Sequence, residues 1–468
     1  MMGPSAHAGR LSVCLASSMF VRIFVTAAMV GTALVGMSGA LASDVTLTTS
    51  VAARAPAAAA VAPTWGAVTT RASVGVAGQE GNHFSDEPAI SGDGRFVAFY
   101  SKASNLVPED TNNRLDVFVR DRVANVTRRV SVGPHGRQGN GISYSPSISP
   151  DGRYIVFSST ASNLIPRDTN HRTDVFVRDR VTKVTRRVSV GPHARQGNGR
   201  SYYGAISADG RYVAFSSEAS NLVAADTNDS VDVFVRDRVT KMTRRVSVGP
   251  HSRQANDDSY LPALSAHGRY IAFESPASNL VPKDTNDKFD VFVRDRASQT
   301  TRRMSLTEDG GQFPFRSYDA SISPNGRFVA FTSGPSGRSG TFTDVYLRDR
   351  VMRTTELISV TTTGLPSKRA SGAGTVFPGG HLVAFSSSSP RLVTDDTNLE
   401  HDVFVRDRTA AVTTLASVAT DGTQGDDSSF NPAISADGEH LAFTSVATTF
   451  VAPDTNAQPD VFVRDRQP

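Results

Sequence analysis

The sequence predicts an all-β fold, a seven-bladed β-propeller with four antiparallel strands in each blade. A heptapeptide, Asp-Val-Phe-Val-Arg-Asp-Arg or a near copy, recurs seven times at intervals of 58, 58, 58, 54, 58 and 58 residues. The copies begin at Asp116, Asp174, Asp232, Asp290, Asp344, Asp402 and Asp460. So regular a period indicates one structural unit repeated in tandem. Each unit carries four short strand signals, which is typical of a propeller blade.

The second unit shows the four strands in order. Strand A is predicted at Ser143–Ser149, strand B at Tyr154–Ser159, strand C at Asp174–Asp179 and strand D at Val184–Val190. β-Branched and aromatic residues fill these runs, and Gly, Pro, Asp and Asn separate them. No helical apolar period interrupts the pattern, so the unit is predicted to be a purely antiparallel blade.

The two ends of the repeat region complete one another. The last copy ends after its strand C, at residues 460–466, whereas Thr69–Val74 matches the fourth strand of the first unit, residues 126–132. We therefore expect the N-terminal strand to pair in the last blade and close the ring. Closure would remove the open edge that a chain of blades otherwise exposes.

The N-terminus predicts export. Residues 1–42 carry Arg10 and Arg22, an apolar run over Ile23–Met37 and the small-residue ending Ala40-Leu41-Ala42, which together indicate a signal peptide. An uncleaved anchor over residues 23–42 is the alternative. Residues 43–66 are predicted to be a flexible linker and residues 67–468 the propeller. The mature protein is expected to be secreted or otherwise extracytoplasmic, monomeric and without a membrane span.

Composition excludes several classes of partner and site. The single cysteine, Cys14, lies in the predicted signal peptide, so a cysteine-ligated metal is not expected in the mature chain. Removal of Arg10 and Arg22 leaves 47 basic against 45 acidic residues. This near balance does not predict a nucleic-acid partner, which needs clustered cationic side chains.

The repeat also carries a family resemblance. Ser149–Phe157 (SPDGRYIVF), followed by Asp-Val-Phe-Val-Arg-Asp and Thr-Arg-Arg-Val-Ser, resembles the WD-repeat-like propeller repeat of TolB and its relatives, over about residues 68–466. The resemblance implies the propeller fold of a bacterial secreted protein. TolB itself pairs its propeller with a smaller N-terminal domain and docks a peptidoglycan-associated lipoprotein, whereas here a linker precedes the blades. Propellers of prolyl oligopeptidase relatives are similar too, but they accompany a hydrolase domain.

Loop lengths predict which face carries function. In blade two the A–B turn (150–153) and the C–D turn (180–183) are short, while the B–C loop (160–173) and the D–A loop (191–200) are long. Alternate connections of an up-and-down blade lie on opposite faces, so the long loops share one face. We call it the long-loop face, and we expect binding residues there.

The B–C loops supply the first candidate site, an Asp-Thr-Asn-x-x-x-Asp motif. Its polar residues are Asp110, Asn112 and Asp116; Asp168, Asn170 and Asp174; Asp226, Asn228 and Asp232; Asp284, Asn286 and Asp290; Asp396, Asn398 and Asp402; and Asp454, Asn456 and Asp460. Clustered hard oxygens suit calcium, although the spacing is that of an incomplete calcium loop. The alternative is a structural turn in which Asp and Asn cap their own backbone. Blade five lacks the motif, and its shorter loop, 334–343, predicts a notch in the long-loop face.

Two further charged motifs are shared by several blades. The D–A loops of blades one to three contain His135 and Arg137, His193 and Arg195, and His251 and Arg253. They are interpreted as solvated loop residues, with an anion-binding surface as the alternative. The Arg-Asp-Arg end of strand C and the Thr-Arg-Arg of strand D are expected to pair across their hairpin as part of the scaffold.

The start of strand A supplies the last candidate site, the mouth of the central channel. Its first residue is always serine, and the two that follow vary between blades. The predicted ligand-binding residues are Asp86, Glu87, Tyr144, Tyr202, Tyr203, Tyr260, Tyr318 and Asp319. Aromatic and acidic side chains around a channel would suit a sugar, a peptide end or a cation. The alternative is a hydrated channel without a ligand.

No sequence motif marks a catalytic centre, such as a nucleophile elbow or a His-Glu-x-x-His pair. The sequence therefore favours a secreted, non-catalytic scaffold that binds an envelope protein or a glycan on the long-loop face. A propeller-type polysaccharide lyase or glycosidase is the alternative.

Overall fold

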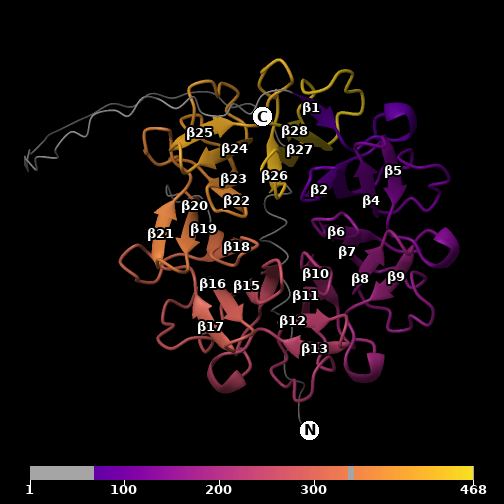
Figure 1. The fold of residues 1–468 in the computed structure, drawn as a ribbon, viewed down its shortest axis with the longest axis vertical. Helices are drawn as coiled ribbons and strands as arrows, with labels where there is room; N and C mark the ends of the chain where they lie inside the picture. The colour runs from indigo at the N-terminus through magenta and orange to yellow at the C-terminus, as the bar shows by residue number, and fades with distance from the viewer. Residues whose placement is uncertain (1–67, 336–341, 467–468) are drawn as a thin grey trace, which may run out of the picture. The chain divides into compact units, whose positions relative to one another are not determined.

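The chain forms a ring of seven four-stranded antiparallel sheets (Figure 1). In this computed structural model, residues 68–335 and 342–466 are described. The predicted signal peptide and linker lie outside the described residues, as do residues 336–341 of the loop for which a notch is predicted. The predicted fold class, an all-β propeller with seven blades, is confirmed.

Every blade contributes its strands in the predicted order, with A innermost. The A strands are β2 (Ser85–Ile90), β6 (Ser143–Ile148), β10 (Ser201–Ile206), β14 (Tyr260–Leu264), β18 (Ser317–Ile322), β22 (Ser371–Val376) and β26 (Ser429–Ile434). The B strands are β3 (Phe96–Ser101), β7 (Tyr154–Ser159), β11 (Tyr212–Ser217), β15 (Tyr270–Ser275), β19 (Phe328–Ser333), β23 (Leu382–Ser387) and β27 (His440–Ser445). The C strands are β4 (Asp116–Asp121), β8 (Asp174–Asp179), β12 (Asp232–Asp237), β16 (Asp290–Asp295), β20 (Asp344–Asp349), β24 (Asp402–Asp407) and β28 (Asp460–Asp465).

The outer strands are shorter than predicted. The D strands are β5 (Val126–Arg129), β9 (Val184–Arg187), β13 (Met242–Arg245), β17 (Thr300–Arg303), β21 (Thr354–Leu357) and β25 (Val412–Leu415). In blade two the ladder ends at Arg187 because the chain then bends toward the next blade, and Val190 bridges Gln196 instead. The D–A loops that follow contain the 3-10 turns η1 (Val76–Gly78), η2 (Pro134–Gly136), η3 (Pro192–Ala194) and η4 (Pro250–Ser252).

The N-terminal strand β1 (Thr69–Arg71) closes the ring as predicted. It pairs antiparallel with β28, with Thr69 opposite Arg464 and Arg71 opposite Phe462. The hydroxyl of Ser73 donates to Asp460 at 2.5 Å, as Ser189 does to Asp174 at 2.6 Å in blade two. The first residues of the described chain therefore supply the outer strand of the seventh blade.

Aromatic pairs form the repeated core. In each blade the strand B phenylalanine stacks on the strand C aromatic residue, with ring centroids 5.7 to 6.0 Å apart. The pair Phe99 and Phe118 in blade one has no exposed surface. Burial of each such side chain stabilises the fold by about 1.5 to 3 kcal/mol, which accounts for the recurrence of these residues.

The repeated charges pair within the scaffold, but their partners differ from those predicted. Asp121, at the end of strand C, binds Arg95 of the A–B turn at 2.9 Å rather than an arginine of strand D. The sheet register explains this partner, because Phe96 lies directly opposite Asp121. The strand D arginines turn instead toward the start of strand C, as described below for the B–C loops.

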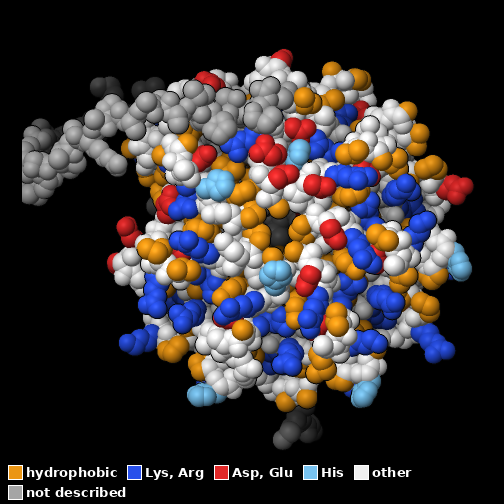
Figure 2. Space-filling model, viewed as in Figure 1, with side chains coloured by type: hydrophobic (Ala, Val, Ile, Leu, Met, Phe, Trp, Pro, Cys, Tyr) orange, Lys and Arg blue, Asp and Glu red, His pale blue; other side chains and the backbone are white. Residues whose placement is uncertain are grey.

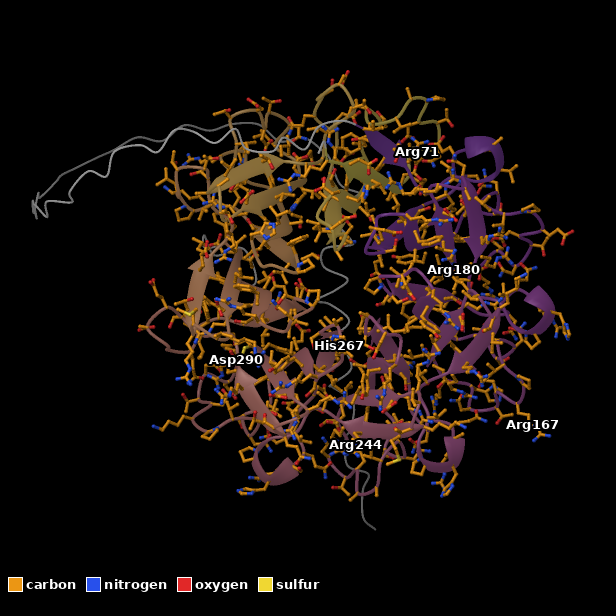
Figure 3. The ribbon with its side chains drawn as sticks, viewed as in Figure 1. Arg71, Arg167, Arg180, Arg244, His267 and Asp290 are labelled. Atoms are coloured by element: carbon orange, nitrogen blue, oxygen red, sulfur yellow. The ribbon has the colours of Figure 1, made fainter. Side chains whose placement is uncertain are left out.

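On the face opposite the long-loop face, where the A–B and C–D turns lie, arginines join neighbouring blades by stacking on aromatic rings. Phe96 of blade one lies between Arg95 of its own blade, at 4.8 Å from the ring centroid, and Arg180 of blade two, at 3.9 Å. Figure 3 labels Arg180 at this boundary. The same arrangement recurs around Tyr154, Tyr212, Tyr270 and Phe328. We call these five contacts the arginine stacks.

Gly152 is expected to be irreplaceable because the Phe96 ring occupies the space where a side chain would lie. Gly152 also has a φ of +67°, which costs other residues about 1 kcal/mol. We expect Gly152→Ala to lower the melting temperature by considerably more than that conformational cost. Gly136, with a φ of +78° and no atom within 4 Å of the position that a β-carbon would take, provides the matched Gly136→Ala control. Equal destabilisation by the two variants, measured by thermal unfolding, would contradict the packing explanation.

Within residues 68–335 and 342–466, none of the helices has the length and apolar character needed to span a membrane.

Candidate functional site at the rim of the channel

The seven A strands surround a central channel (Figure 1). Each contacts the A strand of the next blade, and β26 contacts β2 to complete the circle. Figure 2 shows the ring hollowed at its centre, and Figure 3 places His267, from the turn after β14, beside that hollow. Residues on the A strands are therefore the ones that a ligand in the channel would meet.

The serine that begins each A strand belongs to the scaffold. Ser143 is fully buried, and its hydroxyl lies 2.9 Å from the hydroxyl of Ser159 on strand B. The same pair occurs in all seven blades, at 2.8 to 3.1 Å. These hydroxyls fix the start of strand A against strand B and are not available to a ligand.

Two residues after this serine, every A strand contains a β-bulge. The register with strand B shifts there in each blade, for example between Tyr202 and Ala205. Six bulge residues have a positive φ, between 48° and 54°: Glu87, Ser145, Tyr203, Leu261, Asp319 and Asn431. A bulge redirects a side chain and is frequent next to binding sites. The backbone is therefore the same around the rim, while the side chains it presents are different.

Several predicted rim residues are brought together across blade boundaries. Ser145 donates to the Glu87 carboxylate at 2.9 Å, and Asn431 donates to Asp86 at 2.9 Å. Within blade three, the rings of Tyr202 and Tyr203 meet edge to face, with centroids 5.1 Å apart. Side-chain hydrogen bonds thus join rim residues at the boundaries of blades one and two and of blades seven and one.

Other predicted rim residues are held by contacts within the scaffold. Asp86 is buried and accepts hydrogen bonds from Tyr100 of its own blade and from Asn431 and Thr444 of blade seven. Tyr260 donates to Asp258 at 2.6 Å and stacks on Phe289. Burial raises the pKa of the hydroxyls of Tyr144 and Tyr318, which are also hydrogen-bonded to loop residues. These contacts favour a supporting role for Asp86, Tyr144, Tyr260 and Tyr318.

Sequence reasoning missed Glu274, a buried carboxyl group next to the rim. It accepts a hydrogen bond from the backbone nitrogen of Asp319 at 3.2 Å and is only 5% exposed. Burial, followed by the negative charge of Asp319, raises the pKa of Glu274 to about 8. The other blades carry Tyr, Ser, Ser, Thr, Ser and Thr at this strand B position, so alignment of the repeats would have singled it out.

In the B–C loops, an arginine lies between the two aspartates of the predicted calcium motif. In blade three, Arg245 of β13 approaches Asp226 at 2.8 Å and Asp232 at 3.2 Å. Equivalent contacts, at 2.8 to 3.6 Å, join Arg129, Arg187 and Arg303 to the aspartates of blades one, two and four. In these blades the guanidinium already compensates the carboxylate charge, and the asparagine caps the turn, as Asn170 does for Arg172. These contacts favour the structural-turn interpretation there.

Blade seven receives its arginine from the N-terminal strand, and Figure 3 labels it. Arg71 approaches Asp454 at 3.1 Å, Asp460 at 3.3 Å and Glu80 at 2.9 Å. One carboxylate oxygen from each acid lies within 4.8 Å of the others, so the group is compact enough for a metal ion. Burial raises the pKa of Asp460 to about 7. Arg71 supplies the positive charge of this cluster.

The histidines of the D–A loops stay apart. His135, His193 and His251 lie in separate exposed turns, η2 to η4, of three successive blades. Beside them, two outer grooves of about 820 and 940 Å³ run between blades one and two and between blades three and four. Basic side chains line both grooves, including Arg128 and Arg137 in one and Arg244 and Arg253 in the other. The grooves support the anion-binding alternative but lie on the outside of the ring, away from the channel.

Comparison with known proteins agrees with the fold. No protein-family model and no curated protein sequence matches the chain. An oligogalacturonate lyase in complex with manganese is 12% identical, with coverage of 82% of this chain and 90% of the other and a TM-score of 0.51. The propeller domain of the Trilobed protease from Pyrococcus furiosus is also 12% identical, with coverage of 82% and 96% and a TM-score of 0.51.

TolB is also among the similar structures. TolB from Acinetobacter baumannii is 13% identical over 71% of this chain, with a TM-score of 0.39, and the match spans 62% of the length of that TolB. At these identities the likeness shows the fold alone. The propeller fold that the TolB-like repeat implies is confirmed by the seven four-stranded sheets themselves.

Charge is distributed unevenly around the ring. Blades six and seven, residues 371–466 with 68–84, contain 14 acidic and six basic residues, whereas blades one to five, residues 85–370, contain 30 acidic and 40 basic residues. On the face shown in Figure 2, Lys and Arg side chains gather over the lower blades. Because like charges reinforce one another within a sector, cations are favoured near blades six and seven and anions near blades one to five.

Proposed function

We propose that the protein is a secreted, non-catalytic scaffold that binds an envelope protein or a glycan at the rim of its channel, on the long-loop face. Export rests on the signal-peptide pattern of residues 1–42. The binding surface comprises the bulge residues and the long loops around them.

The observation that carries this proposal is the contrast between shared and varied residues at the rim. The repeated serines, aspartates and arginines are engaged within the scaffold, as the pair Ser143 and Ser159 illustrates. The bulge residues share one backbone conformation but include Glu87, Tyr203 and Asp319. A rigid ring that presents different side chains at equivalent positions suits recognition of an asymmetric ligand.

The second candidate function is a carbohydrate-active enzyme, and Glu274 is the observation in its favour. A carboxyl group whose pKa is about 8 keeps its proton at neutral pH and can act as a general acid. Asp319 would be the second carboxylate of a glycosidase pair. The oligogalacturonate lyase with the same fold acts on an acidic sugar chain, which makes such chains a reasonable first substrate to test.

Binding should be measured with the full chain against peptidoglycan fragments and against neutral and acidic polysaccharides, with release of new sugar ends followed in the same samples. We expect binding without turnover, and we expect Tyr203→Ala with Asp319→Ala to weaken it by about tenfold or more. His193→Ala, on the outer edge, is the control and should bind like wild type.

Two results would contradict binding at the rim, and a third would contradict the non-catalytic scaffold. Binding that survives the double substitution would move the ligand away from the rim. Binding that is lost in His193→Ala would place it on the outer edge. Turnover that disappears in Glu274→Gln would establish the enzyme instead.

A further inference from the structure

In the B–C loop of blade six, the aspartate pair lacks the arginine that accompanies the pairs of blades one to four. The register places Leu415 of β25 opposite Phe404, as Arg129 of β5 lies opposite Phe118 in blade one. Leu415 therefore replaces the arginine that approaches both aspartates in blades one to four. The aspartates themselves, Asp396 and Asp402, are retained.

Blade five shows what happens when the arginine and the first aspartate are lost together. There Leu357 occupies the arginine position, opposite Tyr346, and the loop contains no Asp-Thr-Asn motif. The remaining Asp344 accepts hydrogen bonds from Ser359 at 2.7 Å and Ser367 at 3.1 Å. Blade six differs because it keeps two buried carboxylates without the cation that the other pairs have.

Both carboxylates of blade six are buried, and that of Asp396 is incompletely satisfied, whereas Asp402 also accepts from Ser417 at 2.6 Å. Asp396 is 6% exposed and Asp402 is not exposed at all. Both accept from the same amide nitrogen of Gln424, at 3.0 and 2.9 Å, which orients the Asp396 carboxylate toward Asp402. The second oxygen of Asp396, Oδ2, is buried and has no hydrogen-bond partner. Among the described residues, neither aspartate has a basic group within 4.0 Å, although the exposed Arg369 acts on the charge of Asp396.

The orientation of the glutamine indicates where a positive charge would lie. In blades one and two, the equivalent Gln138 and Gln196 turn their carbonyl oxygen toward the arginine, at 2.7 and 3.0 Å. In blade six the amide is reversed, and the Gln424 nitrogen faces the carboxylates. Rotation of this amide would restore the arrangement of the other blades and add a third hard oxygen to the pair.

We propose that blade six binds a calcium ion between Asp396 and Asp402, in the place that the arginine guanidinium takes in blades one to four. The ligands would be the two carboxylates and the Gln424 carbonyl oxygen, with water completing the shell. Calcium matches this set because all the donors are oxygen atoms and a dication balances two carboxylates. The exposed Thr397 and Leu399 leave the loop open to solvent, and the excess of acidic residues in blades six and seven favours cation entry.

The proposal is independent of the ligand at the channel rim and is tested with calcium alone. The full chain, freed of metal with EDTA, is titrated with calcium chloride by calorimetry, and its melting temperature is recorded with and without millimolar calcium. We expect one calcium ion per chain and a rise in melting temperature of several degrees. Absence of both in the folded wild type would overturn the proposal.

Two variants locate the site. Leu415→Arg supplies the missing guanidinium and should weaken calcium binding by about a hundredfold or more while the protein remains folded in EDTA. Asp226→Asn, which alters the equivalent aspartate of an arginine-bearing blade, should leave calcium binding unchanged. Calcium binding that persists in Leu415→Arg, or that is lost in Asp226→Asn, would overturn the assignment to blade six.

Discussion

Removal of β1 is expected to unfold the propeller or to lower its melting temperature by about ten degrees, which is the shift that a loss of about ten kcal/mol produces in a ring of this length. A chain that begins at residue 77 lacks the outer strand of blade seven, whereas one that begins at residue 67 keeps it. The comparison of these two chains by thermal unfolding isolates the strand from the segment that precedes it.

The size of the effect follows from what β1 and the residues after it contribute. Loss of the ladder with β28 removes hydrogen bonds worth about 1 kcal/mol each. Loss of Arg71 leaves the buried carboxylates of Asp454 and Asp460 without their cation, which costs about 3 to 5 kcal/mol. Ala72 and Val74 also leave the core. The total is comparable with the whole stability of a typical domain, about 5 to 15 kcal/mol.

A point variant distinguishes the stability that the paired strand contributes from the stability that the charge of Arg71 contributes. Arg71→Leu keeps β1 in place but removes the guanidinium, so we expect a smaller loss than for the deletion and one that diminishes at low pH, where the aspartates accept protons. If the chain from residue 77 melts at the same temperature as the chain from residue 67, β1 does not hold the ring closed.

Glu274→Gln is expected to stabilise the propeller above neutral pH. In the folded protein the pKa of Glu274 is raised from 4.5 to about 8, so the folded state keeps a proton that the unfolded chain releases. The stability contributed by this proton is complete below pH 4.5 and falls as the pH rises through about 8. The slope is at most about 1.4 kcal/mol per pH unit. Glutamine does not titrate and can still accept from the backbone nitrogen of Asp319.

The measurement is the melting temperature of wild type and Glu274→Gln from pH 5 to pH 9. The two curves should lie close together at pH 5, and the variant should melt several degrees higher at pH 9. Asp402 and Asp460, whose pKa values are raised to about 6 and about 7, lower the stability of both proteins with rising pH, so the difference between the curves isolates Glu274. Glu218→Gln, at an exposed position, is the control and should follow the wild-type curve. A difference between wild type and Glu274→Gln that does not change from pH 5 to pH 9 would contradict the burial of a protonated carboxyl group at Glu274.

The repeats allowed the fold to be predicted almost completely, since each strand recurs seven times and local signals reinforce one another. The closing strand was visible because Thr69–Val74 copies residues 126–132. The partners of charged side chains were not visible in the same way. Arg245 and Asp226 are 19 residues apart in the sequence, and only the sheet register brings them within 2.8 Å of each other.

The residues of the candidate site were named from the sequence, but their contacts could not be predicted. Comparison of the repeats located the start of strand A, yet a regular strand pattern does not reveal the bulges at Tyr203 and Asp319. Glu274 was missed because a single acid among Ser and Thr residues looks unremarkable until strand B is superposed across blades. Whether Asp110 or Asp396 has a cationic neighbour likewise depends on one residue in a different strand.

The arginine stacks divide the ring into two parts. They connect each blade to the next from blade one through blade six. Blade seven is joined to its neighbours by other contacts, because the Phe377 ring of blade six lies over Gly438 and Arg122 of blade one pairs with Asp465 at 2.7 Å. Units that share one repeated contact tend to open together. Backbone amides at the five boundaries with arginine stacks should therefore exchange their hydrogens with solvent at similar rates, as one cooperative unit.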